Sequence, residues 1–270
     1  MQDVERALRW GVCRARDLRA AGLSPDGIDR LVREGWLVRE ARGVYARPDA
    51  DAELVHAARR HMVLTCLSAC HAHGLWVWHR PHPPHVARSD STRTPGVIIH
   101  RVRCVPRQPV APVLDALVTA FRCAPPREAI AAAESAVKYG RITHDELLAA
   151  FTGQRDRRIR ASIGRIRTGS ASLPETLARL ALEDAGFEVR MQVEIEGVGH
   201  VDGMVDGVAY EVDGRAFHSG PVEFEEDRRR WNALMALGIP SVRIPARWVL
   251  ANPDAAITVV RRVLDGWRAS

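Results

Sequence analysis

A hairpin signal near the C-terminal end constrains the fold of this 270-residue chain more than any other feature. The dipeptide Asp206-Gly207 strongly favours a two-residue turn between antiparallel strands. The segments on its two sides, 200–205 and 208–213, both carry the residue pattern of short strands. The sequence therefore predicts an antiparallel strand pair with a fixed register at this point.

Acidic side chains gather at one end of this predicted hairpin. Alternation along 208–213 places Glu211 and Asp213 on one face of the strand, and the register brings Asp202 close to them. Carboxylates repel one another, and Mg²⁺ or Mn²⁺ relieves this repulsion because these ions prefer oxygen ligands. We therefore expect Asp202, Glu211 and Asp213 to bind a divalent metal, with a structural ion-pair network as the alternative.

Helices and further strands surround the hairpin in the order typical of an α/β sandwich. Ser172 and Pro174 are placed to begin a helix that runs to about Asp184. Alternating residues follow at 187–195, a charged helix begins near Glu223, and a buried strand and a last helix are expected at 241–244 and 255–267.

This rear part, about residues 170–265, resembles the restriction-endonuclease-like PD-(D/E)XK nucleases, and within them the branch of very-short-patch-repair endonucleases. The matching residues are Glu175, Gln192, Val201-Asp202, Glu211-Val212-Asp213-Gly214, His218, Asp227-Arg228 and 238–243. The resemblance implies metal-dependent hydrolysis of phosphodiester bonds, in which the metal activates water and offsets charge in the transition state. It also implies that Asp202 and Glu211 hold the metal, Asp213 assists them, and Glu175 lies across the cluster.

One departure from the nuclease pattern affects the chemistry. Asp213 stands where the general pattern has a lysine, and the single lysine of the chain is Lys138, far outside the segment. The resemblance to the repair branch makes His218 the candidate general acid or base. Arg228 begins a run of three arginines that could reach a backbone phosphate or form an ion-paired helix face with the preceding acidic residues.

The front of the chain carries most of the positive charge. Residues 1–170 hold 28 basic and 17 acidic side chains, a net charge of +11, whereas residues 171–270 hold 11 and 16, a net charge of −5. A basic front supplies sequence-independent attraction for phosphates. The chain has no apolar run long enough to span a membrane, and its five scattered cysteines do not form the pattern of a disulfide framework, so we expect a protein of the reducing cytoplasm.

The first fifty residues have helix-turn-helix spacing. A helix at 14–22 ends at glycine, Ser24 begins a second helix at 27–34, and 36–46 forms two short strands around a turn. This pattern predicts a winged helix whose second helix enters the major groove of duplex DNA, although winged helices also bind proteins. The DNA-binding candidates are Arg30 and Arg33 on that helix and Arg39 and Arg42 on the wing. The segment resembles the N-terminal domain of abortive-infection (AbiEi-type) antitoxins.

The middle region contains eight of the eleven histidines, all between residues 56 and 100. We expect a helix at 61–75, strands near 86–87 and 97–99, and helices near 113–122, 126–139 and 144–151. Cys66 and Cys70 lie one helical turn apart beside His71 and His73, so a zinc site and an apolar helix with free thiols are both considered. Gln154 to Arg167 is a basic stretch without strong apolar periodicity.

Together these patterns predict a mixed α/β protein with three domains: a winged helix at 1–52, an antitoxin-like α/β spacer at 53–165 and a restriction-endonuclease-like sandwich at 166–270. The expected function is a metal-dependent DNA endonuclease in repair or phage defence. The alternative is an antitoxin-type transcriptional regulator with an inert nuclease fold. Double-stranded DNA is the expected partner, no membrane is expected, and a homodimer and a toxin or defence-system partner are further expectations.

Overall fold

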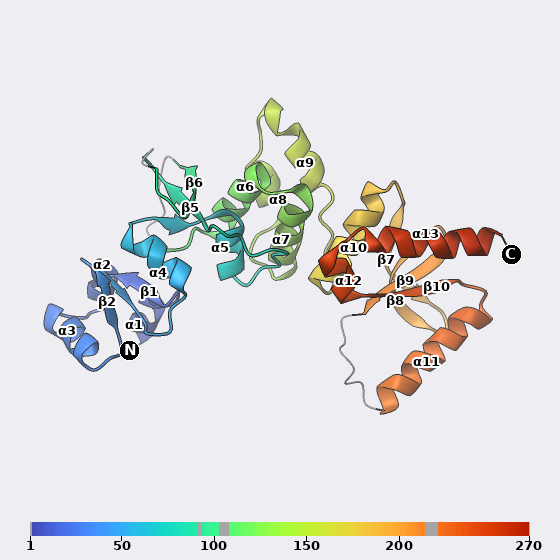
Figure 1. Ribbon diagram of the computed structural model, residues 1–270, viewed down its shortest axis with the longest axis horizontal. Coiled ribbons are helices and arrows are strands. Elements are labelled where there is room, and N and C mark those ends of the chain that lie inside the picture. The colour runs from blue at the N-terminus through green and yellow to red at the C-terminus, as the bar shows by residue number, and fades with distance from the viewer. Residues whose placement is uncertain (1, 91–92, 103–107, 214–220, 270) are drawn as a thin grey trace. The chain divides into compact units, whose positions relative to one another are not determined.

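The computed structural model describes residues 2–90, 93–102, 108–213 and 221–269, and it divides into two compact units, 1–165 and 166–270. Helices and three small sheets alternate along the chain, so the fold is mixed α/β as predicted (Figure 1). No helix within the described ranges is long and apolar enough to cross a membrane. The predicted boundary at residues 52 and 53 stays a prediction.

The N-terminal part of the first unit is built around a three-stranded antiparallel sheet with the strand order β1-β3-β2. Its elements are α1 (Gln2–Ala7), β1 (Val12–Arg14), α2 (Ala15–Ala20), α3 (Pro25–Arg33), β2 (Val38–Ala41), β3 (Val44–Ala46) and α4 (Ala52–Arg59). This order agrees with the predicted winged helix, in which α2 and α3 would be the helix-turn-helix and β2 and β3 the wing. A core that includes Leu18, Ile28 and Tyr45 holds the helices on the sheet.

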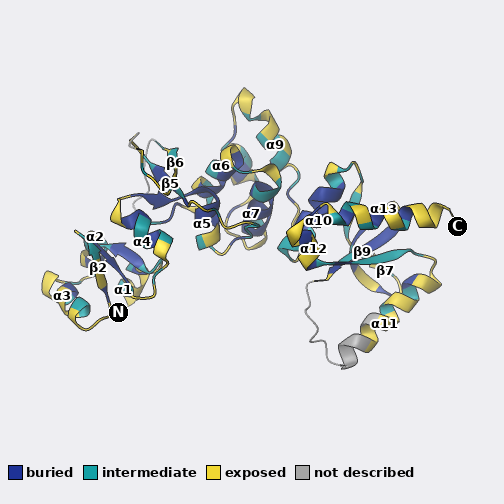
Figure 2. Ribbon diagram, viewed as in Figure 1, coloured by how far each residue is buried: buried dark blue, intermediate teal, exposed yellow. Residues whose placement is uncertain are grey.

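The described part of the rest of the first unit joins a second small sheet to five helices. Its elements are β4 (Val63–Leu64), α5 (Cys66–Ala72), β5 (His85–Arg88), β6 (Ile98–Arg101), α6 (Val113–Cys123), α7 (Pro126–Lys138), α8 (His144–Ala149), a 3₁₀ turn at Gln154–Asp156, and α9 (Arg157–Ile163). Strand β5 pairs antiparallel with β4 and parallel with β6. Helix α7 is buried along most of its length, as the dark blue ribbon in Figure 2 shows.

One prediction for this region needs correction. The predicted helix 61–75 is wrong at its start, because His61 has a left-handed φ of 57° and Val63–Leu64 pairs with β5 as a strand. The helix proper is the shorter α5. The basic stretch from Gln154 to Arg167, to which the sequence analysis assigned no element, is largely helical. Its apolar periodicity is weak because Ile163 is the one buried residue of α9.

The second unit has a four-stranded mixed sheet with helices on both faces. Its elements are α10 (Leu173–Asp184), β7 (Val189–Ile195), β8 (Gly199–Val205), β9 (Val208–Asp213), α11 (Pro221–Ala236), β10 (Ser241–Pro245), α12 (Ala246–Ala251) and α13 (Ala255–Arg268). The strand order is β10-β9-β8-β7, with β10 parallel to β9 and the other pairs antiparallel. Helices α10, α12 and α13 lie on one face and α11 on the other (Figure 1).

The predicted hairpin is present in this sheet. Asp206 and Gly207 have φ values of 49° and 86°, the two positive angles that a type I′ turn requires. Val205 pairs with Val208 directly beside the turn, and the register continues to Gly203 and Tyr210. Turn chemistry and register therefore place Asp202 beside the strand that carries Glu211.

Candidate functional site

Helix α3 carries two exposed arginines together with two exposed aspartates, Asp26 and Asp29. Ser24 caps the helix by accepting a hydrogen bond from the Gly27 N–H at 3.1 Å, as the sequence predicts. Ile28 is buried against the sheet, whereas Arg30 and Arg33 are exposed. The cap and the buried isoleucine thus fix the helix while these two guanidinium groups face solvent, where a phosphate backbone could reach them.

The other two predicted DNA-binding arginines lie on the wing. Arg42 is exposed in the turn between β2 and β3, beside Gly43 with a φ of 73°. Arg39 on β2 instead donates a hydrogen bond to Asp29 of α3 at 2.7 Å and lies 5.5 Å above the ring of Tyr45. The ion pair links the wing to α3, and it reduces the positive charge that Arg39 offers to a phosphate.

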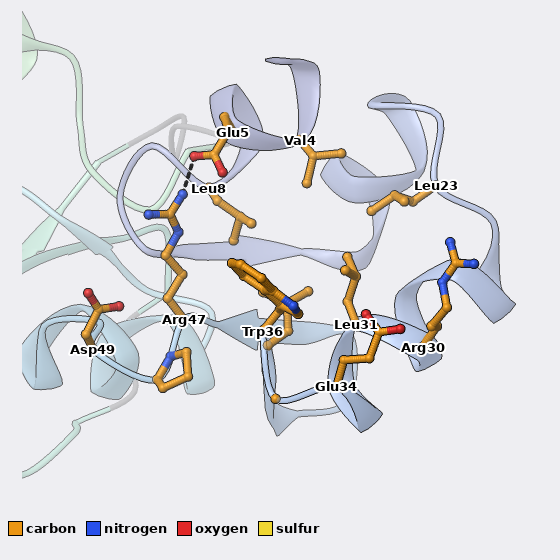
Figure 3. Close-up of a pocket in the computed structure, with 13 residues that line it drawn as sticks. Val4, Glu5, Leu8, Leu23, Arg30, Leu31, Glu34, Trp36, Arg47 and Asp49 are labelled. Carbon is orange, nitrogen blue, oxygen red and sulfur yellow. Dashed lines mark hydrogen bonds and ion pairs between the residues drawn. The ribbon is translucent and has the colours of Figure 1, made fainter. Parts of the chain in front are cut away.

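A groove of about 700 Å³ adjoins α3 on the side toward α1 (Figure 3). Its lining combines apolar side chains, among them Val4, Leu8, Leu31 and the highly exposed Trp36, with charged groups of both signs. Arg30 lies at its edge. Because the groove carries Glu5, Glu34 and Asp49 as well as arginines, it lacks the uniform positive charge of a phosphate-binding surface.

In the second unit, Asp202 lies between β8 and β9. Its Oδ2 accepts a hydrogen bond from the Val212 N–H at 2.8 Å. This side-chain contact continues the hairpin beyond Gly203 and Tyr210, where the backbone register between β8 and β9 ends. The pKa of Asp202 is raised from 3.8 to about 6, mainly by burial; the carboxylates of Glu175 and Glu211 contribute to the rise, and the Val212 N–H and Arg230 act in the opposite direction. Glu175 and Glu211 are therefore electrostatic neighbours of Asp202.

Glu211 is held by two arginines that the sequence analysis did not assign to the site. Its Oε1 accepts from the Arg230 guanidinium of α11 at 2.7 Å, and its Oε2 lies 3.3 Å from Nε of Arg243 on β10. Arg230 also donates to the backbone carbonyls of Val198 and His200. The sequence signal for Arg243 is the predicted strand 241–244. Its parallel pairing with β9 in the structure sets Arg243 directly opposite Glu211.

Glu175 uses both carboxylate oxygens at the start of α10. Oε1 accepts from the Ser172 hydroxyl at 2.7 Å and Oε2 from the Ala171 N–H at 2.7 Å. The pattern closely resembles a capping box, and it confirms the predicted start of this helix. Glu175 accordingly has a structural role whether or not it contributes to a metal site.

The remaining predicted site residues are less closely placed. Asp213 is exposed at the end of β9, and Arg228 is exposed on α11. His218 lies outside the described residues. Among the described side chains, the ligand atoms of Asp202, Glu211 and Asp213 do not all lie within 4.8 Å of one another. The predicted metal binding by these three carboxylates stays a prediction.

The donor atoms at this place are oxygens, the type that Mg²⁺ prefers. Two positive charges already neutralise Glu211, however, so a divalent cation would have to displace at least one of the ion pairs with Arg230 and Arg243 before Glu211 could bind it. Both alternatives considered from the sequence thus have a counterpart in the structure. The ion pairs around Glu211 correspond to the ion-pair network, and the partly buried carboxylate of Asp202 is a candidate metal ligand.

Comparison with known proteins gives a match for the N-terminal segment. Residues 4–48 match the model of a family described as transcriptional regulator, AbiEi antitoxin, and this range runs from α1 through the wing. Over most of its length the chain is similar to two proteins of Mycobacterium tuberculosis, the uncharacterized protein Rv2248 of strain H37Rv and the uncharacterized protein MT2308 of strain CDC 1551. Each is 28% identical over 264 residues, which covers 88% of this chain and 96% of the relative. The N-terminal segment is therefore similar to an antitoxin-type transcriptional regulator domain.

Proposed function

We propose that the protein is a DNA-binding transcriptional regulator of the antitoxin type, which contacts duplex DNA through α3 and the wing. The match of residues 4–48 to the AbiEi antitoxin model carries this proposal. The exposed Arg30 and Arg33 on α3 and Arg42 at the tip of the wing supply the phosphate-binding charge, and the net charge of +11 over residues 1–170 adds long-range attraction. The antitoxin description also leads us to include a toxin as partner in this proposal.

The test is binding to the DNA upstream of the protein's own coding sequence. Fluorescence anisotropy would compare this duplex with an unrelated duplex of the same length and base composition, at one fixed salt concentration. We expect at least about tenfold tighter binding to the upstream duplex, because specific sites exceed non-specific binding by a wide margin. The double variant Arg30→Ala/Arg33→Ala should lose most of this binding, whereas Arg262→Ala, an exposed arginine of α13, should keep it. Equal affinity for the two duplexes would remove the regulator from consideration.

A second candidate function is a metal-dependent endonuclease in the second unit. The observation that favours it is the group of Glu175, Asp202 and Glu211, in which burial and the neighbouring carboxylates raise the pKa of Asp202 to about 6. Perturbed carboxylates of this kind are typical of functional sites, although ion-pair networks also produce them. Asp202 and Glu211 would hold Mg²⁺ or Mn²⁺, which would supply an activated water and offset charge on the phosphate.

Supercoiled plasmid tests this candidate. The protein would be incubated with Mg²⁺ or Mn²⁺ and compared with Asp202→Asn and Glu211→Gln, which keep side-chain size. Glu196→Gln serves as the control, because Glu196 is an exposed residue of the turn between β7 and β8. Nicking that is lost in the two site variants and kept in the control would support the nuclease. DNA that is bound but never cut with either metal would exclude it.

A further inference from the structure

Four potential metal ligands converge in the first unit, on elements other than α3 and the wing. They are Cys66, His85, His100 and Cys123, and their ligand atoms all lie within 4.8 Å of one another. Cys66 is buried, the two histidines are partly buried, and Cys123 is exposed. The four residues come from four different elements, α5, β5, β6 and α6, so their proximity is a product of the fold.

Each ligand is positioned by the secondary structure that carries it. The parallel register of β5 and β6 places His85 opposite Ile98 and Ala87 opposite His100, so the two imidazoles lie on the same face of the sheet. Cys66 is the first residue of α5 and Cys123 is the last residue of α6, and these two helices pack against each other. Cys66 has a left-handed φ of 53°, a conformation that few non-glycine residues adopt unless their surroundings hold them in it.

The separations already approach those of a tetrahedral site. Nδ1 of His85 lies 2.9 Å from Nε2 of His100 and 3.7 Å from Sγ of Cys123. Around a tetrahedral Zn²⁺ with Zn–N distances of about 2.0 Å and Zn–S distances of about 2.3 Å, ligand atoms lie roughly 3.3–3.8 Å apart. These two separations differ from the tetrahedral values by a few tenths of an ångström, and the other ligand pairs lie within 4.8 Å of one another.

We infer that Cys66, His85, His100 and Cys123 bind a structural Zn²⁺ ion. Two thiolates and two imidazoles form a ligand set that selects zinc over Mg²⁺ or Ca²⁺, which prefer oxygen. Four protein ligands leave no open coordination position, and closed sites of this type stabilise a fold. The ion would link the sheet β4-β5-β6 to helices α5 and α6. It is independent of the Mg²⁺ or Mn²⁺ considered for the second unit.

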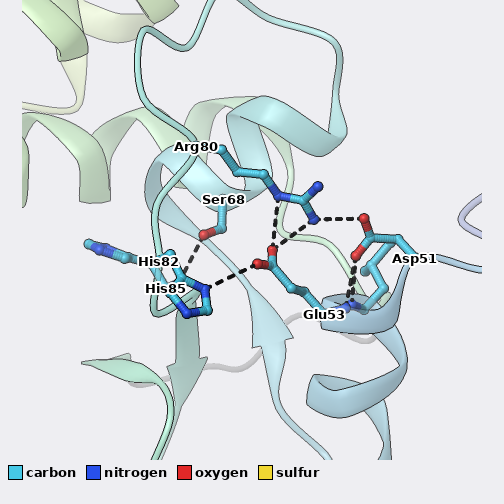
Figure 4. Close-up of polar contacts among 7 residues, drawn as sticks. Asp51, Glu53, Ser68, Arg80, His82 and His85 are labelled. Carbon is cyan, nitrogen blue, oxygen red and sulfur yellow. Dashed lines mark hydrogen bonds and ion pairs between the residues drawn. The ribbon is translucent and has the colours of Figure 1, made fainter.

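Polar contacts at His85 and in the segment before β5 accompany this site (Figure 4). The hydroxyl of Ser68 on α5 accepts a hydrogen bond from the His85 N–H at 2.9 Å, which ties the helix of Cys66 to the strand of His85. Arg80, in the segment that leads to β5, is paired with Asp51 at 2.7 Å and with Glu53 at 2.9 Å. The first contact positions the backbone of His85, and the second anchors the segment before β5 to the start of α4.

Two arrangements compete with zinc at the same place. Cys66 and Cys123 could form a disulfide, or both thiols could stay free beside a hydrogen-bonded pair of neutral histidines. A disulfide would leave the two imidazoles without a ligand role, and it would remove two thiols from a titration with a thiol reagent. The free-thiol arrangement would give a full thiol count and no bound metal.

The experiment uses the full-length protein, purified with a non-thiol reductant, stripped with a chelator and titrated with Zn²⁺ and then with Co²⁺. We expect one Zn²⁺ per chain by elemental analysis, a rise in the melting temperature on zinc addition, and the intense visible absorption of tetrahedral, thiolate-bound Co²⁺. Cys123→Ser and His100→Gln should each weaken zinc binding at least about tenfold. Because Cys123 is exposed, its variant should fold, which a circular dichroism spectrum would verify.

Cys70→Ala is the matched control, because Cys70 lies one turn from Cys66 on α5 but is not among the four converging ligands. It should bind zinc and Co²⁺ as the wild type does. The inference is overturned if the reduced wild-type protein binds no zinc, if both ligand variants keep full stoichiometry and affinity, or if the thiol count shows a Cys66–Cys123 disulfide in the protein as isolated under reducing conditions.

Discussion

Gly203 lies against the ring of Tyr210, on the strand that carries Asp202. This contact leaves no room for a side chain at position 203. A Cβ atom on Gly203 would be 2.5 Å from three atoms of the Tyr210 side chain, which is 2% exposed and cannot move aside freely. We predict that Gly203→Ala destabilises the second unit by about 1–3 kcal/mol through overpacking. Urea unfolding followed by circular dichroism measures the change.

Gly266→Ala is the control of opposite sign for this substitution. Gly266 is exposed on α13, and apart from its chain neighbours and the nearby backbone of its own helix no atom lies within 4 Å of the added Cβ, so alanine should raise stability by up to about 1 kcal/mol. Equal effects of the two substitutions would mean that the contact between Gly203 and Tyr210 is not the cause.

The buried carboxylate of Asp202 gives the second unit a characteristic pH dependence. Because its pKa is raised from 3.8 to about 6, its contribution favours the folded state below pH 4 and is lost as the pH rises through about 6. Asp202→Asn removes the ionisation, and its amide oxygen can still accept the hydrogen bond from the Val212 N–H. We predict that the variant is more stable than the wild type above pH 6, by on the order of 1 kcal/mol because the group is partly solvated.

Unfolding of both proteins in a chelator at pH 4 and pH 8 tests this prediction. The stability difference in favour of the variant should be larger at pH 8. A difference that is the same at both values would show that Asp202 has an ordinary pKa in the folded protein.

At the scale of single elements, the N-terminal cap of α3 connects stability to DNA binding. Ser24→Ala removes the acceptor for the Gly27 N–H and should cost about 1 kcal/mol in the first unit. Fraying of the first turn should also weaken DNA binding several-fold, because α3 carries Arg30 and Arg33. Denaturation and anisotropy would be measured on the same samples. Ser24→Thr keeps the hydroxyl and should behave nearly as the wild type. If Ser24→Ala binds DNA with unchanged affinity, the cap does not contribute to DNA binding.

Long elements with local signals could be predicted from the sequence. Ser24 and Ser172 begin α3 and α10 as expected, and Asp206-Gly207 forms the predicted turn, because caps and type I′ turns depend on a few adjacent residues. The strands β1 and β4, with three and two residues, were not predicted. Such short strands exist through pairing with distant segments, which leaves almost no local signal.

The candidate sites also combine contacts with a local sequence signal and contacts that depend on tertiary packing. The proximity of Asp202 to the strand of Glu211 follows from the hairpin register, which the sequence contains. The ion pair with Arg230 could not be predicted, because it depends on how α11 packs on the sheet. The ligand set of Cys66, His85, His100 and Cys123 has no recognisable spacing, since it is assembled from four elements through tertiary packing.

At the scale of the whole molecule, charge and structure divide the chain in a similar way. The first 170 residues carry a net charge of +11 and the remainder −5, and the compact units meet at residues 165 and 166. Electrostatic attraction to DNA should therefore come from the first unit, and substitutions in the second unit should leave DNA affinity unchanged. The central claim is therefore that the protein binds duplex DNA through α3 of the first unit.

The most direct test of that claim is the salt dependence of DNA binding. Anisotropy titrations over a series of salt concentrations give the slope of log K against log salt, which changes by about 0.9 for each phosphate contact. For Arg30→Ala/Arg33→Ala we predict weaker binding and a slope reduced by between about 1 and 2, with Arg262→Ala equal to the wild type. An unchanged slope and affinity in the α3 variant would contradict DNA binding through this helix.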